Sequence, residues 1–393
     1  MKKWKKRHAP MKRYILLMAG CILFFTACIN NDLNKSIRTV DRFPLETGKV
    51  NIVFDSCLIK IDSTQQTFYK VSFVKDNYYY AYNVAGKALD IFDLKAKEFK
   101  HSVPFSGPPV SAIFVQSKDS IFLLSDKSIT LINEGGKVLK ELHINSNNKT
   151  YTGFFQKNYI VSDPECQTLF FDAGERKVYV HSIEPVYGTC SKKHFNVPIL
   201  TSANIDSGYF RTVPVFFSNS YNENYYGFQV IPKFLFLDDK IIYNFPIDSR
   251  IFVYDKKYDS TIAFRPVSKI SVNEATPVPK EFCRNDDKKL EYYITNVFFD
   301  KVIYSKALDQ YFQFKRDAMN GFDKPKENGE YSTINDKKMI MSIFDKDLRF
   351  KAEVQLPKKT GLILNSFAVD SCIYIPTSKG KGSLYFSVLK IQQ

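Results

Sequence analysis

Short apolar runs that follow polar turns are the dominant pattern along the chain. A polar pair precedes three apolar residues in "DSCLI" (55–59), "DNYYY" (76–80), "DSIFL" (119–123), "KNYIV" (157–161), "DKIIY" (239–243), "DKVIY" (300–304) and "DSCIY" (370–374). Asp, Asn and Ser favour turns because their side chains bond to nearby backbone groups, and apolar runs of this length are typical of buried strands. The pattern therefore predicts many short strands.

A second pattern predicts hairpins. An apolar pair, an Asp or Asn, a polar turn and a further apolar run recur in "IFDLKAKEF" (91–99), "LINEGGKVL" (131–139), "VYDKKYDSTI" (253–262) and "IFDKDLRFKAEV" (343–354). Two strands joined by a short polar turn fit this order, and Gly135 and Gly136 can supply the positive φ that tight turns require.

One stretch, 111–144, contains both patterns and four apolar runs in sequence. Four antiparallel strands in about 35 to 45 residues make one blade of a β-propeller. Hairpins recur near 88–101, 128–142, 176–199, 250–265, 339–356 and 373–391. We therefore predict an all-β protein, a β-propeller with six four-stranded blades. Five or seven blades stay open, because 200–235 and 265–295 have no clear strand pattern.

The propeller is expected to be a single domain, 46–393, closed by pairing between its two ends. "SLYFSVLKI" (383–391) is expected to lie beside an early strand such as "NIVF" (51–54), because a closed ring leaves no exposed sheet edge. Long amphipathic helices are missing, which argues against a parallel α/β sheet. The best short helix candidate lies in 274–294 and starts near Pro279.

The N-terminus predicts an exported, lipid-anchored protein. A basic segment precedes the apolar run 14–27, which would reach only about 21 Å as a helix and is too short to span a bilayer. We assign 1–27 as a signal peptide, with Met11 as an alternative start. "FFTAC" resembles a lipoprotein lipobox, so Cys28 is the expected lipidation site, with Cys21 as the rival. Residues 28–45 are expected to form the lipidated cysteine and a tether.

Charge and cysteine usage narrow the functional classes. The net charge of +15 falls to about +8 without the seven basic residues of the signal peptide, and the remaining lysines are scattered, so no nucleic-acid partner is expected. Cys57 and Cys372 lie in apolar runs and are expected to be buried thiols. A disulfide between Cys166 and Cys190 is one further option.

The chain resembles a family of uncharacterised Gram-negative lipoproteins that contain a TolB-like six-bladed propeller. The lipobox at Cys28 and the stretches 108–142, 238–255 and 298–316 carry the resemblance. It implies the fold and a location in the cell envelope, and it implies no activity.

No catalytic set is visible in the sequence. There is no G-x-S-x-G elbow and no H-E-x-x-H zinc motif, and no metal or other cofactor is expected. His181 and His194, the nearest pair after the signal peptide, are expected at the surface or at strand ends. We therefore do not expect an enzyme, although a hydrolase or lyase with residues drawn from several blades is a third hypothesis.

Tyrosine clusters are the weak ligand-binding candidates. In "NYYYAY" (77–82), alternation places Tyr78, Tyr80 and Tyr82 on one strand face and Tyr79 on the other, which packing between blades explains. Around "NENYYGF" (222–228), the tyrosines at 221, 225 and 226 lie in a polar loop and could stack on a sugar.

We hypothesise a binding or scaffold lipoprotein with an envelope protein or peptide partner. A glycan-binding or small-ligand-binding lipoprotein is the alternative. Ile29 follows Cys28 in place of the Asp that retains some lipoproteins at the inner membrane, so anchoring in the outer membrane is expected, on either its periplasmic or its surface side.

Overall fold

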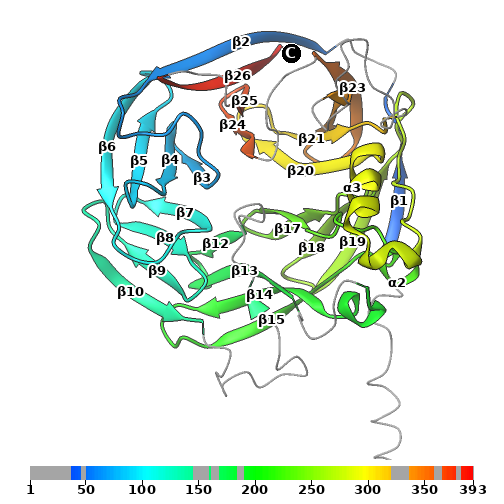
Figure 1. Ribbon diagram of the computed structural model, residues 1–393, viewed down its shortest axis with the longest axis horizontal. Coiled ribbons are helices and arrows are strands. Elements are labelled where there is room, and N and C mark those ends of the chain that lie inside the picture. The colour runs from blue at the N-terminus through cyan, green and yellow to red at the C-terminus, as the bar shows by residue number, and fades with distance from the viewer. Residues whose placement is uncertain are drawn as a thin grey trace, which may run out of the picture. The chain divides into compact units, whose positions relative to one another are not determined.

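Short strands separated by polar turns make up most of the computed structural model. It describes residues 37–45, 50–144, 159–160, 168–183, 190–319, 336–357, 365–377 and 382–392. The strands form six sheets that follow one another around a common axis (Figure 1). The protein is a six-bladed β-propeller, so the predicted fold is confirmed.

The first three blades follow the chain in order. Blade 1 contains β3 (Ser72–Lys75), β4 (Tyr78–Asn83), β5 (Ala88–Asp93) and β6 (Glu98–Pro104). Blade 2 contains β7 (Ala112–Ser117), β8 (Ser120–Leu124), β9 (Ser128–Ile132) and β10 (Val138–His143). Blade 3 contains β12 (Leu169–Asp172), β13 (Lys177–Ile183), β14 (Pro198–Asn204) and β15 (Phe210–Phe216), and β11 (Tyr159–Ile160) also pairs with β13.

Two of the remaining three blades recruit a strand from the N-terminal part of the chain. Blade 4 contains β16 (Lys233–Phe236), β17 (Lys240–Asn244), β18 (Ile251–Asp255), β19 (Ser260–Pro266) and β1 (Arg38–Arg42). Blade 5 contains β20 (Phe298–Ser305), β21 (Gln310–Arg316), β22 (Met339–Asp345) and β23 (Phe350–Leu356). Blade 6 contains β24 (Phe367–Val369), β25 (Cys372–Thr377), β26 (Ser383–Gln392) and β2 (Asn51–Lys60).

The ring closes where the two ends of the propeller pair. Strand β2 runs antiparallel to β26 from Asn51 opposite Gln392 to Lys60 opposite Ser383. Ile59 of β2 is fully buried in a cluster that also contains Phe386 of β26 and Tyr79 of blade 1. The predicted closure is therefore confirmed, and it joins blade 6 to blade 1.

The expected tether, 28–45, requires a correction at its C-terminal part. Residues 38–42 form β1, which pairs in parallel with β19, and the Leu45 amide donates to the Phe350 carbonyl of blade 5 at 3.0 Å. The compact unit thus begins at Arg38 and not at residue 46. An extended segment beside the open edge of β19 gains backbone hydrogen bonds that a solvated tether would lack. The signal peptide, Cys21 and Cys28 lie outside the described residues.

Aromatic side chains fill the space between neighbouring blades, as the alternation in β4 predicts. Tyr80 and Tyr82 pack in one cluster with Ile113 and Val115 of blade 2. Tyr79 points the other way and packs on Phe386 of blade 6, with ring centroids 5.3 Å apart. A single strand therefore helps to hold two blade boundaries.

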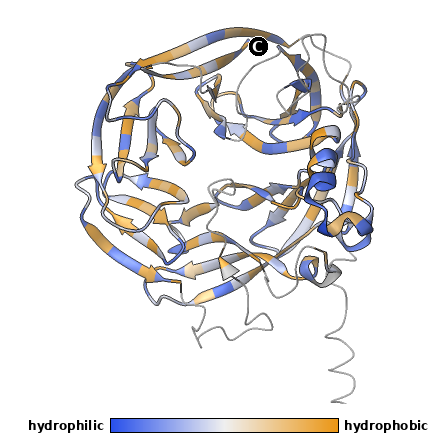
Figure 2. Ribbon diagram, in the orientation of Figure 1, coloured by the Kyte–Doolittle hydropathy of each residue, from blue (hydrophilic) through white to orange (hydrophobic). Residues whose placement is uncertain are grey.

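In the part of the chain that the structure describes, the helices lie in the connections between strands. They are η2 (Lys192–Phe195), α2 (Ser220–Glu223), η3 (Lys280–Arg284) and α3 (Asp286–Thr295), and the last two confirm the helix expected in 274–294. Figure 2 shows α3 as largely hydrophilic, and none of its residues is fully buried. Within the described residues, no helix has the length and apolar character to cross a membrane.

Because neighbouring strands of a blade run antiparallel, successive connections lie alternately on two faces of the propeller, which we call the loop face and the turn face. The loop face carries the connections that join second to third strands and one blade to the next, including 190–197, 217–232 and 267–297. The turn face carries the short turns that follow each inner strand. The two faces can therefore hold different sites.

The histidine pair is buried, contrary to expectation. His181 is 2% exposed and His194 is 5% exposed, and the His181 ring lies 6.0 Å from that of Phe234, across the boundary of blades 3 and 4. Burial, with the nearby charges of Lys233 and His194, lowers the pKa of His181 to about 3. The imidazole is therefore neutral at physiological pH.

Ring closure is testable on adjacent residues of β2. Ile59→Ala is expected to lower the free energy of unfolding by about 2–5 kcal/mol, because it removes buried methyl groups and leaves a cavity. Leu58→Ala, at a side chain 46% exposed, is the matched control and should stay within about 0.5 kcal/mol of the parent. Denaturant unfolding measures both, and equal effects would contradict the closure.

The buried imidazole predicts a pH dependence of stability. The folded state holds His181 neutral down to about pH 3, whereas the unfolded chain takes up a proton below about pH 6.5. The free energy of unfolding is therefore unaffected by this group above pH 6.5. Below that pH it falls by at most about 1.4 kcal/mol per pH unit, because only the unfolded chain takes up the proton. In denaturant titrations from pH 7 to pH 4, His181→Gln should lose stability less steeply than the parent. Identical slopes for the parent and the variant would refute the assignment.

Candidate functional site

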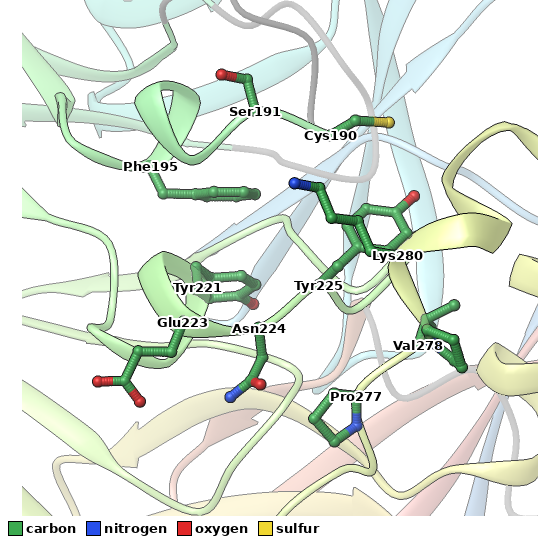
Figure 3. Close-up of a pocket in the computed structure, with 11 residues that line it drawn as sticks. Cys190, Ser191, Phe195, Tyr221, Glu223, Asn224, Tyr225, Pro277, Val278 and Lys280 are labelled. Atoms are coloured by element: carbon green, nitrogen blue, oxygen red, sulfur yellow. The ribbon is translucent and has the colours of Figure 1, made fainter.

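Three connections of the loop face enclose a pocket of about 290 Å³. They come from within blade 3, from between blades 3 and 4, and from between blades 4 and 5. Figure 3 shows the lining residues, which are Cys190, Ser191, Phe195, Tyr221, Glu223, Asn224, Tyr225, Pro277, Val278, Pro279 and Lys280. The site therefore depends on segments that are distant in sequence.

A disulfide holds two of these connections together. Cys190 precedes η2, Cys283 lies in η3, and their Cα atoms are 6.0 Å apart. Cys190 is thus bonded to Cys283 and not to Cys166, which corrects the option considered from sequence; Cys166 lies outside the described residues. The bond links residues 93 positions apart in the sequence. It holds the loop within blade 3 against the connection between blades 4 and 5. Cys57 is a buried free thiol, as expected, and Cys372 is a half-buried one.

An aromatic stack forms one wall of the pocket. The Phe195 and Tyr221 rings lie 5.0 Å apart and nearly parallel, at 18° (Figure 3). Phe217 packs edge-on against both rings from behind, at 5.0 and 5.5 Å. The Tyr221 hydroxyl donates to the Gln229 carbonyl at 2.6 Å, and burial, with Asp248 adding, raises its pKa well above the usual value. The stack is therefore a rigid apolar surface.

The short helix α2 is fixed from below by an arginine. The Arg250 guanidinium donates to the Ser218 hydroxyl at 2.7 Å and to the Ser220 hydroxyl at 2.6 Å. It also pairs with the Asp248 carboxylate, whose side chain is 5% exposed. A four-residue helix has little stability of its own, so these contacts hold Tyr221 in place.

The opposite wall is formed by the connection between blades 4 and 5. The Val278 amide donates to the Tyr225 carbonyl at 2.7 Å, which joins this wall to the segment after α2. Pro277 and Pro279 flank Val278, and Tyr225, Val278 and Cys283 share a small apolar cluster. At the rim, Glu223, Asn224 and Lys280 are exposed. The pocket thus combines rigid apolar walls with a polar rim that carries one acidic and one basic side chain.

The lining of this pocket is mainly apolar and aromatic, and its one cysteine, Cys190, is held in the disulfide. Among the described residues, no three His, Cys, Asp or Glu side chains gather as metal ligands. Apolar and aromatic walls with a few polar groups are typical of ligand and peptide sites.

The structure brings two of the three tyrosine candidates into the pocket. Tyr221 and Tyr225 line it, and Tyr226 packs beside Tyr221 at 5.5 Å without reaching it. Their exposures are 1%, 9% and 2%, so they form walls and core and do not offer open faces for a sugar. The sequence did not indicate Phe195, the prolines or Cys283, because no spacing relates segments that meet only across blades. The candidate Cys28 lies outside the described residues.

The fold and the site define a β-propeller with an aromatic-walled pocket on its loop face. The chain belongs to the family described as "Domain of unknown function (DUF4221)", which matches residues 43–353. This family membership confirms the resemblance noted in the sequence.

Solved structures support the same fold. A member of the DUF4221 family from Bacteroides vulgatus is 15% identical, with a TM-score of 0.71 over 88% of this chain and 99% of that one. A putative exported protein from Bacteroides fragilis is 10% identical, with a TM-score of 0.56 over 90% of this chain and 100% of that one. No curated protein matches the sequence.

The disulfide is expected to stabilise the loop face. Replacing both Cys190 and Cys283 by Ser should lower the free energy of unfolding by about 2–4 kcal/mol, because the cross-link restricts the unfolded chain. A reductant should destabilise the parent by a similar amount and leave the double variant unchanged. Cys372→Ala, which removes a free thiol, should respond to the reductant like the parent. A parent insensitive to the reductant would contradict the prediction.

Proposed function

We propose that this protein is a lipid-anchored propeller of the outer membrane that holds an envelope protein or a peptide segment at its loop-face pocket. The observation that carries the proposal is a preformed pocket with aromatic and proline walls, fixed by a disulfide and by Arg250. A rigid site loses little entropy when a partner binds, so even a small contact can give useful affinity.

The lining residues favour a peptide or protein over other ligands. Pro277 and the rim residues Glu223, Asn224 and Lys280 are exposed, so a polypeptide segment can meet both apolar and charged groups at the mouth of the pocket. Glu223 and Lys280 at the rim can pair with both charges of a polypeptide. The buried tyrosines offer no open ring for sugar stacking, so the glycan alternative gains no support at this site.

Three observations support a location in the envelope. The N-terminal sequence has the basic segment, apolar run and lipobox-like cysteine of an exported lipoprotein. Disulfides persist in oxidising compartments outside the cytoplasm, and the Cys190–Cys283 bond fits such a compartment. A structure with the same fold is named a putative exported protein.

Proximity labelling in the native host tests the proposal. A labelling enzyme fused to the C-terminus of the full chain should mark a short, reproducible set of envelope proteins. Cys28→Ala should abolish this set, because the protein would lose its anchor. The double variant Glu223→Ala/Lys280→Ala should remove the specific partner while the anchor remains. Its matched control, Glu98→Ala/Lys100→Ala, changes an exposed ion pair on blade 1 and should keep the partner. Labelling no richer than that of an unrelated lipoprotein would contradict the proposal.

A further inference from the structure

Two short segments meet at the outer edge of the ring between blades 4 and 5. One is 43–45, directly after β1, and the other is 267–273, directly after β19 (Figure 1). Strands β1 and β19 run in parallel, and the Val267 amide continues their pairing by donating to the Arg42 carbonyl at 2.8 Å. The two segments therefore leave blade 4 side by side.

Both segments then contact β23, the outer strand of blade 5. The Leu45 amide donates to the Phe350 carbonyl at 3.0 Å. The Ser268 hydroxyl donates to the Glu353 carboxylate at 2.7 Å. Phe350 and Glu353 are three positions apart on one strand, which is about 10 Å, so the two segments stay close together on blade 5.

Four large apolar side chains are exposed on these segments, and we call them the edge patch. The exposed fractions are 60% for Phe43, 54% for Leu45, 54% for Ile270 and 49% for Val272. In each pair the residue between them is turned toward the protein: Pro44 is half-buried, and the Ser271 hydroxyl donates to the Asp317 carboxylate at 2.8 Å. Single exposed apolar residues are common, whereas a group of them with polar surroundings marks an interaction surface.

The position of the edge patch in the chain indicates what covers it. Arg38, where the compact unit begins, follows Cys28 by ten positions, and a fully extended chain of that length reaches at most about 36 Å. Phe43 and Leu45 are the first exposed large apolar side chains after Arg38 in the described part of the chain. If Cys28 carries the lipid, the membrane surface is therefore within reach of the patch.

The charges next to the edge patch suit a lipid surface. In 41–45 and 265–274 three basic residues, Arg42, Arg265 and Lys269, outnumber two acidic ones, Asp41 and Glu274. Asp41 is paired with Arg265 at 2.8 Å, so it adds no net negative charge. Basic side chains beside exposed apolar ones are typical of segments that lie in the headgroup region of a bilayer.

We infer that the edge patch lies in the headgroup region of the bilayer that carries the lipid anchor. The inference rests on the proposed function, because it needs the anchor at Cys28. The four apolar side chains enter the boundary between headgroups and acyl chains, and the basic residues meet lipid phosphates.

This contact orients the loop-face pocket relative to the membrane. The connection 267–297 supplies Ile270 and Val272 to the edge patch and Val278 to the pocket. The pocket is therefore held close to the membrane surface, and its partner is bound there.

Quenching of single tryptophan replacements tests the inference. The full lipoprotein is reconstituted in vesicles of phosphatidylcholine and phosphatidylglycerol, with and without bromine on the acyl chains, because bromine quenches tryptophan at short range. Leu45→Trp and Ile270→Trp should lose about half of their fluorescence in the brominated vesicles, since interfacial side chains lie about 5–10 Å into the boundary region. The matched controls are Val84→Trp and Leu139→Trp, at side chains 62% and 48% exposed on blades 1 and 2, and they should not be quenched. The parent gives the background of Trp4, the only natural tryptophan.

Flotation of the same vesicles separates failure of the inference from failure of the anchor. If the variants float but Leu45→Trp and Ile270→Trp are not quenched, or if all four variants are quenched equally, the inference is wrong and the anchor stands. If the parent does not float, or Cys28→Ala floats equally well, the anchor is wrong and the inference falls with it. A blue shift of the two edge variants that grows with protein concentration in detergent would assign the patch to a second copy of the chain. The partner variants at Glu223 and Lys280 change no residue of the patch, so partner binding is tested separately.

Discussion

The antiparallel pairing of β2 with β26 is the constraint on which the rest of the structure depends. Neighbouring blades share no backbone ladder among the described strands, so side-chain packing and side-chain hydrogen bonds, such as that from Lys256 to Asp172, join one sheet to the next. A ring built this way opens easily unless its last sheet contains both ends of the chain. In blade 6 the early strand β2 completes the sheet of β24, β25 and β26, and its inward side chains join the core shared with blade 1. In the closed ring, each blade packs between two neighbouring blades.

The N-terminal segment also contacts the outer edges of neighbouring blades. Strand β1 adds to the outer edge of blade 4, Leu45 bonds to blade 5, and β2 completes blade 6. Three successive blades thus have an outer contact with one early stretch of chain. The parallel pairing of β1 with β19 is separate from the closure itself, and it covers an edge that would otherwise be open. The loop-face pocket borders this reinforced part of the ring, because its walls come from the connections on either side of blade 4.

The sequence allowed the blades, their hairpins and the closure to be predicted because these features are local or periodic. Turn residues before apolar runs mark strands wherever they occur, and Gly136 has the positive φ of 77° expected in its hairpin. The partner of Cys190 could not be predicted, because Cys283 reaches it only after a connection between blades folds over the loop face. The tyrosines at 221, 225 and 226 were found as a cluster, but the burial of Tyr221 depends on Phe195 and Phe245, which lie in other segments.

The inner strands of the six blades are not equivalent. Strand β20 of blade 5 carries a bulge between Phe299 and Val302, and the Asp300 carboxylate inserted there is 1% exposed. A bulge changes the direction of the side chains that follow, so β20 presents its side chains in a different order from a regular strand. A cavity of about 540 Å³ at the turn face is accordingly lined by residues of blades 1–4, among them Phe73, Phe114 and Phe170, and by none of β20.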